Sequence, residues 1–337
     1  MCMGNRINYF DQIKAVAMVM VVIGHLLPWT FGVNNSIILT LFATIELPIF
    51  FYIAGFFSSN KKSECSLSTG FKVILKSFVR YIIPMLTVGF LAQLMTDYPF
   101  MDSLLYRGGG RYWFLYTLFL IVVIGTICNL VIRFINSANK FLICIVYGLP
   151  YLVLLVIKYI GVNIPSLFPL SSILVYYPFY ILGVLAVRIE AIHTILLESK
   201  LVLSMSMIGV MFGTWWLSSS SNLLISQFVA LCAIVLFLQI FANLCKSFLD
   251  NKVLSLLTRI GKSTLSIYLL HYFFIFDMKW MEPYLTTSNP VALQLCVSMV
   301  AALVIISICM ALEWILNRTQ ITSFLFLGKL LRNNNNI

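Results

Sequence analysis

Two ionisable side chains, His25 and Glu46, lie in stretches of sequence that are otherwise apolar enough for a lipid bilayer. An ionisable group in hydrocarbon is costly, so it usually faces a partner, a water-filled cavity or a substrate. An imidazole is the natural general base near neutral pH, and a neighbouring carboxylate can orient it and stabilise its protonated form. The pair predicts proton-transfer chemistry within the membrane. Two alternatives remain open: a histidine that only hydrogen-bonds between helices, and a proton relay in a transporter.

Lys14 precedes His25 by eleven positions. On a helix, that spacing is a rise of about 16 Å and a rotation of only about 20° from the starting face. It predicts a cation near the inner surface and a base deep in the bilayer on one track. A donor with an anionic head in the cytosol and a long arm that carries an acyl group would suit this track. With Asp11 and Glu46, these two residues form the candidate catalytic set.

A second group of cations is spaced for one face of a helix. Lys72, Lys76 and Arg80 recur every four residues, so they predict a basic stripe. Such a stripe can lie on anionic lipid headgroups, or it can bind the phosphates of a cytoplasmic donor. The residues alone leave both interpretations open.

The remaining polar signals are weaker. The glycines before Arg111 do not form a phosphate-binding loop, because no Gly-Lys-Ser/Thr follows them. Arg111 and Trp113 fit the outer mouth of a membrane helix, where an ordinary interfacial arginine is the alternative. His271 falls near mid-membrane in a late apolar stretch, whereas His193 is expected to be a solvated loop residue.

The elements that must position these residues are membrane helices. Of the 337 residues, 61% are hydrophobic and only 10% are charged, whereas soluble domains carry about 25% charged residues. The predicted fold is all-α and polytopic, with a single membrane domain over residues 1–337 and no soluble catalytic domain. About ten transmembrane helices are expected, at 12–32, 37–58, 78–96, 112–133, 141–160, 172–188, 201–218, 223–244, 263–281 and 291–316.

The net charge of +11 reflects membrane topology. With the N-terminus inside, most lysines and arginines fall in inner loops, so both termini are predicted to be cytoplasmic. The outer side keeps Arg107, Arg111, Lys158 and Lys279. We therefore expect contact with membrane lipids and no nucleic-acid binding. The eight cysteines include no Cys-x-x-Cys pair, so neither a disulfide framework nor a metal site is expected.

Five segments carry motifs whose joint order and spacing are specific: Asn8–Lys14 continuing to Val22–His25, Leu47–Phe57, Arg80–Pro84, Tyr112–Leu115 and Ser266–His271. They resemble, in family order, the motifs of membrane acyltransferase family 3, which includes bacterial O-acetyltransferases of polysaccharides. Lys14 and His25 meet the family's Arg/Lys-x10-His spacing. Ala54 stands where the family usually has serine.

The resemblance implies acyl transfer from cytoplasmic acetyl-CoA, as a co-substrate and not a bound cofactor. The acceptor would be a hydroxyl of a cell-surface glycan or its lipid-linked precursor, at a bacterial inner membrane. His25 would be the essential base or acyl-relay residue, with Lys14 in support. On this analogy the stripe ending in Arg80 becomes the donor's phosphate site. The expected acceptor or oxyanion side comprises Arg111, Trp113, Tyr268 and His271.

Overall fold

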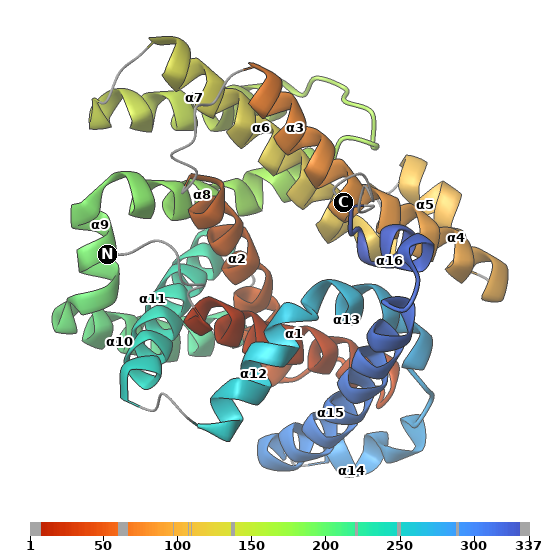
Figure 1. Cartoon of the computed structure of the whole chain (residues 1–337). Helices are drawn as coiled ribbons and strands as arrows, with labels where there is room; N and C mark the ends of the chain where they lie inside the picture. Colours follow the sequence, from red (N-terminus) through yellow and green to blue (C-terminus); the bar gives the residue numbers. More distant parts are fainter. Residues whose placement is uncertain are drawn as a thin grey trace. The chain divides into compact units, whose positions relative to one another are not determined.

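The computed structural model describes residues 8–59, 67–96, 98–106, 108, 110–135, 139–219, 222–247, 251–287 and 290–330. Arg107, which the topology prediction placed on the outer side, lies outside these ranges. Within them every regular element is a helix (Figure 1). The α-helices are α1 (Asn8–Trp29), α2 (Ile37–Ser59), α3 (Leu67–Ser77), α4 (Ile83–Met95), α5 (Phe100–Tyr106), α6 (Trp113–Ile135), α7 (Lys140–Ile160), α8 (Leu170–Arg188), α9 (Glu190–Glu198), α10 (Lys200–Ser219), α11 (Leu223–Ser247), α12 (Lys252–Lys262), α13 (Thr264–Leu270), α14 (Glu282–Thr286), α15 (Val291–Leu316) and α16 (Gln320–Leu327).

The helices confirm the predicted all-α polytopic class. In the part of the chain that the structure describes, nine helices are long and apolar enough to cross a membrane, and a bent helix pair makes a tenth. Some predicted bounds were wrong. The first span begins at Asn8 and ends at Trp29, and the third begins at Leu67 because α3, a π-helical turn at Phe78–Ile82 and α4 follow one another without a break.

The ninth predicted helix, 263–281, is wrong as a single element. Its place is taken by α12 and by α13 with a following 3-10 turn, His271–Phe274, and these two parts meet at an angle of 61°. The predicted inner loop before it is also largely helix, since α12 begins at Lys252. Ser263, the first residue of the predicted helix, instead lies at the junction between α12 and α13.

The described chain divides into two compact units, each assembled from distant parts of the sequence. The first comprises the residues up to Phe50 together with Ala191–Leu312, and the second comprises Phe51–Glu190 together with the residues from Glu313 onward. The expectation of a single membrane domain stays a prediction.

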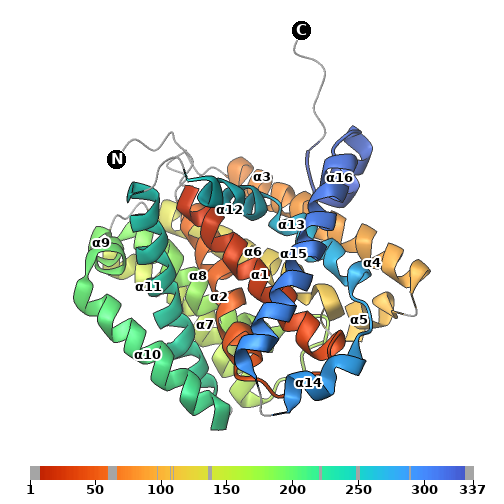
Figure 2. The ribbon, with the colours of Figure 1, turned by 90° about the horizontal axis from the view of Figure 1, so that it is seen from below.

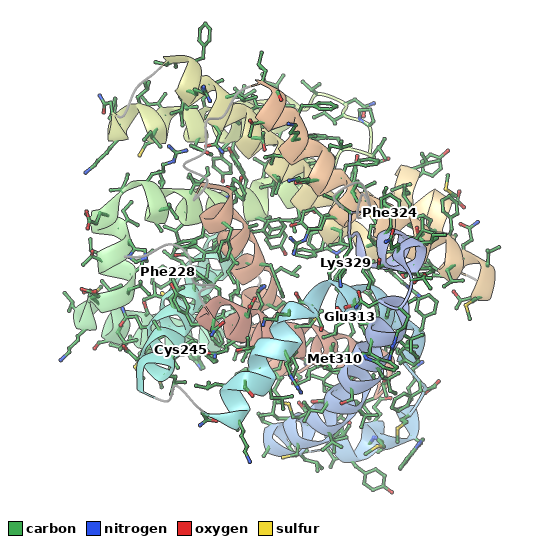
Figure 3. The ribbon with its side chains drawn as sticks, in the orientation of Figure 1. Phe228, Cys245, Met310, Glu313, Phe324 and Lys329 are labelled. Carbon is green, nitrogen blue, oxygen red and sulfur yellow. The ribbon has the colours of Figure 1, made fainter. Side chains whose placement is uncertain are left out.

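In the first unit, α1 packs against α11, α12 and α13 (Figures 1 and 2). A side-chain carbon on Gly261 would lie only 1.7 Å from the Asp11 carbonyl oxygen. The backbones of α12 and α1 can therefore come this close only because residue 261 has no side chain. Gln12 is buried and donates to the Thr258 hydroxyl at 3.3 Å, while the Cys245 thiol of α11 donates to it at 3.1 Å (Figure 3 labels Cys245). Small residues and interhelical hydrogen bonds thus join these helices, as is usual in membranes.

The second unit uses the same device between α2 and α8. Side-chain carbons on Gly55 and Gly183 would lie 2.0 and 2.1 Å from the carbonyl oxygens of Tyr180 and Tyr52. The two helices therefore exchange backbone contacts in both directions. The Tyr180 hydroxyl completes the contact by donating to Ser58 at 2.8 Å.

Candidate functional site

His25 lies in a cluster of aromatic rings in the first unit. Its Nε2 atom is 3.1 Å from the hydroxyl of Tyr272, in the turn that follows α13. The imidazole stacks on Trp29 at a centroid distance of 4.7 Å and on His271 at 5.3 Å. Trp29 follows His25 by one helical turn and thus covers the same face of α1. The ring of His25 therefore stacks on two aromatic partners, and its Nε2 atom lies within hydrogen-bonding distance of a hydroxyl.

His271 is fully buried, and its tautomer follows from its contacts. Its Nδ1 atom lies 3.0 Å from the Ile267 carbonyl oxygen. A carbonyl oxygen only accepts, so Nδ1 carries the proton and, in a neutral ring, Nε2 carries a lone pair. That Nε2 atom is buried and has no hydrogen-bond partner among the residues that the structure describes. His271 thus presents an unused acceptor beside the ring of His25.

Glu46 approaches α1 next to the histidine. Its Oε2 atom would lie 3.5 Å from a side-chain carbon placed on Gly24, the residue before His25. This oxygen is buried and, within the described part of the chain, has no hydrogen-bond partner. Glycine at position 24 leaves the carboxylate against the helix backbone. The site therefore holds a second polar atom whose bonding capacity is unused.

Asp11 and Lys14 form an ion pair in the first turns of α1, with 2.7 Å between Nζ and Oδ1. Asp11 is buried where Gly261 meets α1, whereas Lys14 is 19% exposed. Because α1 runs unbroken from Asn8 to Trp29, Lys14 and His25 do share one helix. The cation of Lys14 is balanced by its neighbour, which the spacing argument did not anticipate.

Tyr272 was missed by reasoning from the sequence, and Tyr268 was found. Tyr268 is buried on α13, with its ring 6.1 Å from His271. The rings of His271 and Tyr272 are 4.0 Å apart, because the chain tightens into a 3-10 turn at these two residues. The available signal was the position of Tyr272 directly after the motif histidine. A tyrosine in an apolar stretch otherwise suggests only an interfacial aromatic.

The basic stripe belongs to the second unit. Lys72 and Lys76 lie exposed on α3, and Arg80 lies exposed on the π-helical turn. The wider winding of a π-turn interrupts the regular spacing of four, so the prediction of one straight stripe was wrong at Arg80. Gly328, at the end of α16, packs on this turn, where a side-chain carbon would lie 2.5 Å from the Arg80 carbonyl oxygen.

Arg111 and Trp113 also belong to the second unit. The Arg111 backbone N–H donates to the Tyr98 hydroxyl at 2.7 Å, and its guanidinium lies over the Tyr98 ring at 4.4 Å. The Trp113 ring packs on Tyr176 at 5.5 Å, and Tyr176 stacks on Phe51 at 4.8 Å. Two motif segments that are about sixty residues apart thus meet through Tyr176.

The described residues hold no group of three or more His, Cys, Asp or Glu side chains arranged to bind a metal ion. The histidines instead contact aromatic rings, a hydroxyl and a carbonyl group. The expectation that neither a metal nor a bound cofactor takes part stays a prediction. The contacts that the structure describes at the site are stacked rings and hydrogen bonds.

Fold and site together define a polytopic α-helical membrane protein with histidines clustered inside its first unit. Comparison with protein-family models identifies an acyltransferase domain of the acyltransferase 3 family over residues 7–313, so the chain belongs to this family of acyltransferases. The resemblance of the sequence motifs is thereby confirmed. Comparisons with curated proteins and with solved structures give no match.

Proposed function

We propose that this membrane acyltransferase moves an acetyl group from cytoplasmic acetyl-CoA to a hydroxyl of a cell-surface glycan or its lipid-linked precursor. We place it in the cytoplasmic membrane of a bacterium. Ten spans would put both chain ends on the same side of the membrane, and the excess of lysine and arginine in the loops on that side makes it the inside. One observation carries the proposal. Two motifs of the family, about 245 residues apart, meet where the rings of His25 and His271 stack at 5.3 Å, and the hydroxyl of the next residue, Tyr272, lies 3.1 Å from His25 Nε2.

In this proposal, His25 Nε2 takes the proton of the acceptor hydroxyl as its oxygen attacks the thioester carbonyl. The C–S bond then breaks, and the CoA thiolate takes the proton back from the imidazolium. The Tyr272 hydroxyl donates to Nε2 before the acceptor arrives and keeps the ring in register. The stacked rings of Trp29 and His271 hold the imidazole in one plane. In the alternative, His25 Nε2 itself attacks the thioester carbonyl and releases the CoA thiolate; the acceptor hydroxyl then attacks the acyl-imidazole, which frees His25, and its proton passes to the thiolate.

The other predicted residues receive roles by their position. The lone pair on His271 Nε2 accepts a hydrogen bond from a second hydroxyl of the acceptor, and Glu46 stabilises positive charge on the His25 imidazole. Tyr268 supports His271 on the same side. The phosphates of CoA bind to the cations Lys72, Lys76 and Arg80. When the donor binds, the ammonium group of Lys14 leaves its ion pair with Asp11 and pairs with an anionic group of the donor. Arg111 and Trp113 belong to the acceptor side.

The test compares two histidines in one chain. His25→Ala should lower acetyl-ester formation on glycans about 100- to 10,000-fold, the usual contribution of a positioned general base. His193→Ala on α9 is the matched control and should keep the wild-type rate. Acetyl esters are measured in membranes that contain equal amounts of each protein. Wild-type acetylation by His25→Ala would sink the proposal.

A transporter is the second candidate, because Glu46 Oε2 and His271 Nε2 are buried polar atoms without a described partner. Such atoms also suit a proton relay. Liposomes that contain the purified protein distinguish the two functions. Proton-coupled sugar flux without acetyl-CoA would favour transport. Acetyl transfer without net flux would favour the acyltransferase.

A further inference from the structure

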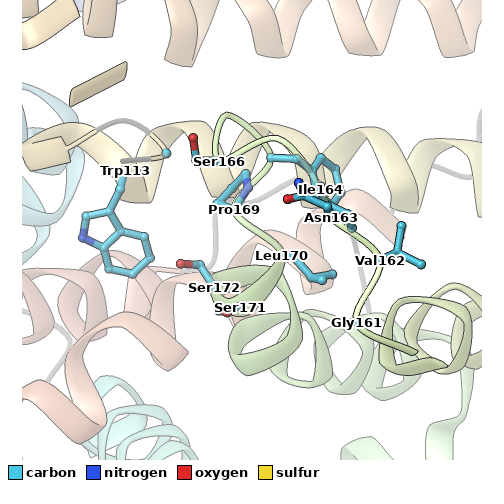
Figure 4. Close-up of a pocket in the computed structure, with 12 residues that line it drawn as sticks. Trp113, Gly161, Val162, Asn163, Ile164, Ser166, Pro169, Leu170, Ser171 and Ser172 are labelled. Atoms are coloured by element: carbon cyan, nitrogen blue, oxygen red, sulfur yellow. The ribbon is translucent and has the colours of Figure 1, made fainter. Parts of the chain in front are cut away.

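The second unit contains a cavity, and most of the residues that line it have been given no role so far. Its volume is about 770 Å³, and its walls come from the start of α6, the 161–169 connection and the start of α8 (Figure 4). Small-molecule sites in proteins typically measure about 300–1,000 Å³. Trp113 lies at one end and Val162 at the other, so the cavity is long (Figure 4). It has room for a ligand of one or more rings.

The walls are joined to each other by direct contacts. The Ser166 hydroxyl donates to the Leu105 carbonyl oxygen at 3.1 Å, and a side-chain carbon on Gly108 would lie 3.3 Å from Pro169. Gly108 also takes a positive φ of 59°, which lets the chain turn there. The two connections therefore meet at one end of the unit. The predicted topology assigns both to the outer side of the membrane.

The lining has a consistent chemistry. None of the twelve described residues that line the cavity carries a charge. Trp113 supplies an aromatic face, and its ring is held from behind by Tyr176. Asn163, Ser171 and Ser172 supply exposed or half-exposed amide and hydroxyl groups that can both donate and accept. An aromatic face beside uncharged donors and acceptors suits the C–H face and the hydroxyls of a sugar.

We infer that this cavity binds an uncharged saccharide, as the acceptor's docking site on the outer side of the protein. That the bound saccharide is the acceptor of the acetyl group rests on the proposed function. An anionic sugar is disfavoured, since the lining residues that the structure describes include no cation to balance a carboxylate or phosphate. Trp113 stacks on the sugar ring, while Asn163 and Ser172 bind its hydroxyls.

The test measures sugar binding apart from chemistry. The full chain is placed in lipid nanodiscs without glycoside detergent, and saturation-transfer NMR follows binding of glucose, galactose, mannose, rhamnose and N-acetylglucosamine. Sodium glucuronate is the anionic comparison. Trp113→Ala should weaken binding of the uncharged sugars about three- to tenfold, the usual effect of losing one aromatic contact. Asn163→Ala should weaken binding with unchanged thermal unfolding, because Asn163 is exposed.

Two controls separate the cavity from the reaction. Trp216→Ala removes an exposed tryptophan of α10, and His25→Ala removes the proposed base; both should bind sugar as the wild type does. The inference is overturned if no sugar of the set binds at 20 mM, if both cavity variants bind normally, or if glucuronate binds as tightly. Sugar binding by a wild-type protein that transfers no acetyl group would sink the proposed function and leave the sugar site standing.

Discussion

The helices α1 and α7 have similar lengths, but most of α1 is buried against other helices, whereas most of α7 is exposed. Over their most apolar windows α1 is 72% buried and α7 only 11%, although α7 is the more apolar of the two. In water the order would be reversed. Lipid tails are as apolar as leucine, so hydrophobicity does not draw one helix to another in a bilayer. Polar groups do, because they need partners, and α1 carries Asp11, Gln12, Lys14 and His25.

The largest effect is expected when one glycine that contacts the buried helix α1 is compared with one glycine on the exposed helix α7. Gly261→Ala would push a carbon into the Asp11 carbonyl oxygen, so α1 and α12 would separate. We expect a loss of about 3 kcal/mol or more of stability. Gly148→Ala on α7 meets nothing within 4 Å and should raise stability by up to about 1 kcal/mol. Thermal unfolding in detergent measures both, and equal midpoints would break the comparison.

A second test concerns the 3-10 turn His271–Phe274, whose His271 and Tyr272 rings pack against His25 of α1. Tyr272→Phe keeps the ring and removes the hydroxyl that meets His25 Nε2. The loss of one positioning hydrogen bond should slow acetyl transfer about tenfold, which is about 1.4 kcal/mol. Tyr284→Phe on α14, where the side chain is exposed, should leave the rate unchanged. Initial rates at saturating acetyl-CoA decide between them; a normal rate for Tyr272→Phe would show the hydroxyl to be unimportant.

A third test removes the polar contacts of Gln12. Gln12→Met has a similar shape but loses the bonds to Thr258 and Cys245. Hydrogen bonds between membrane helices are worth about 0.6 kcal/mol on average and at most about 1.7. We expect a loss of about 1 kcal/mol in unfolding by denaturing detergent. A gain in stability would mean that apolar packing alone holds α1.

The smallest effect is expected on α7. Leu152 is 58% exposed, and its side chain meets lipid whether the helix is packed or not. Leu152→Ala should therefore change stability by less than about 0.5 kcal/mol. The same unfolding assay measures it. A loss above 1 kcal/mol would indicate that α7 is covered by a partner in the membrane.

The helical class and most spans were predictable, because each span depends on local apolarity and length. The break at Ser263 was not, since both of its helices are short and the close approach of Gly261 to Asp11 depends on α1. Apolarity shows where a chain crosses a membrane. It does not show where the crossing bends.

For the site too, the individual residues could be predicted from the sequence, but their contacts could not. His25, Glu46 and His271 stood out individually because ionisable groups are rare in apolar stretches. The contact of His25 with Tyr272 joins residues 247 positions apart, and nothing local encodes it. Of the residues that line the cavity, only Trp113 stood out in the sequence, because serine and asparagine are ordinary residues in connections between helices.

The discontinuous first unit has a consequence for synthesis. The partners of α1 on α12 begin about 220 residues after α1 ends. At typical translation rates of about 5–20 residues per second, α1 waits roughly 10–45 s before α12 emerges. During that time Asp11, Gln12 and His25 face lipid, the translocation machinery or a chaperone. The helix that carries the proposed base therefore stays without its α12 partners for much of the time in which the chain is made.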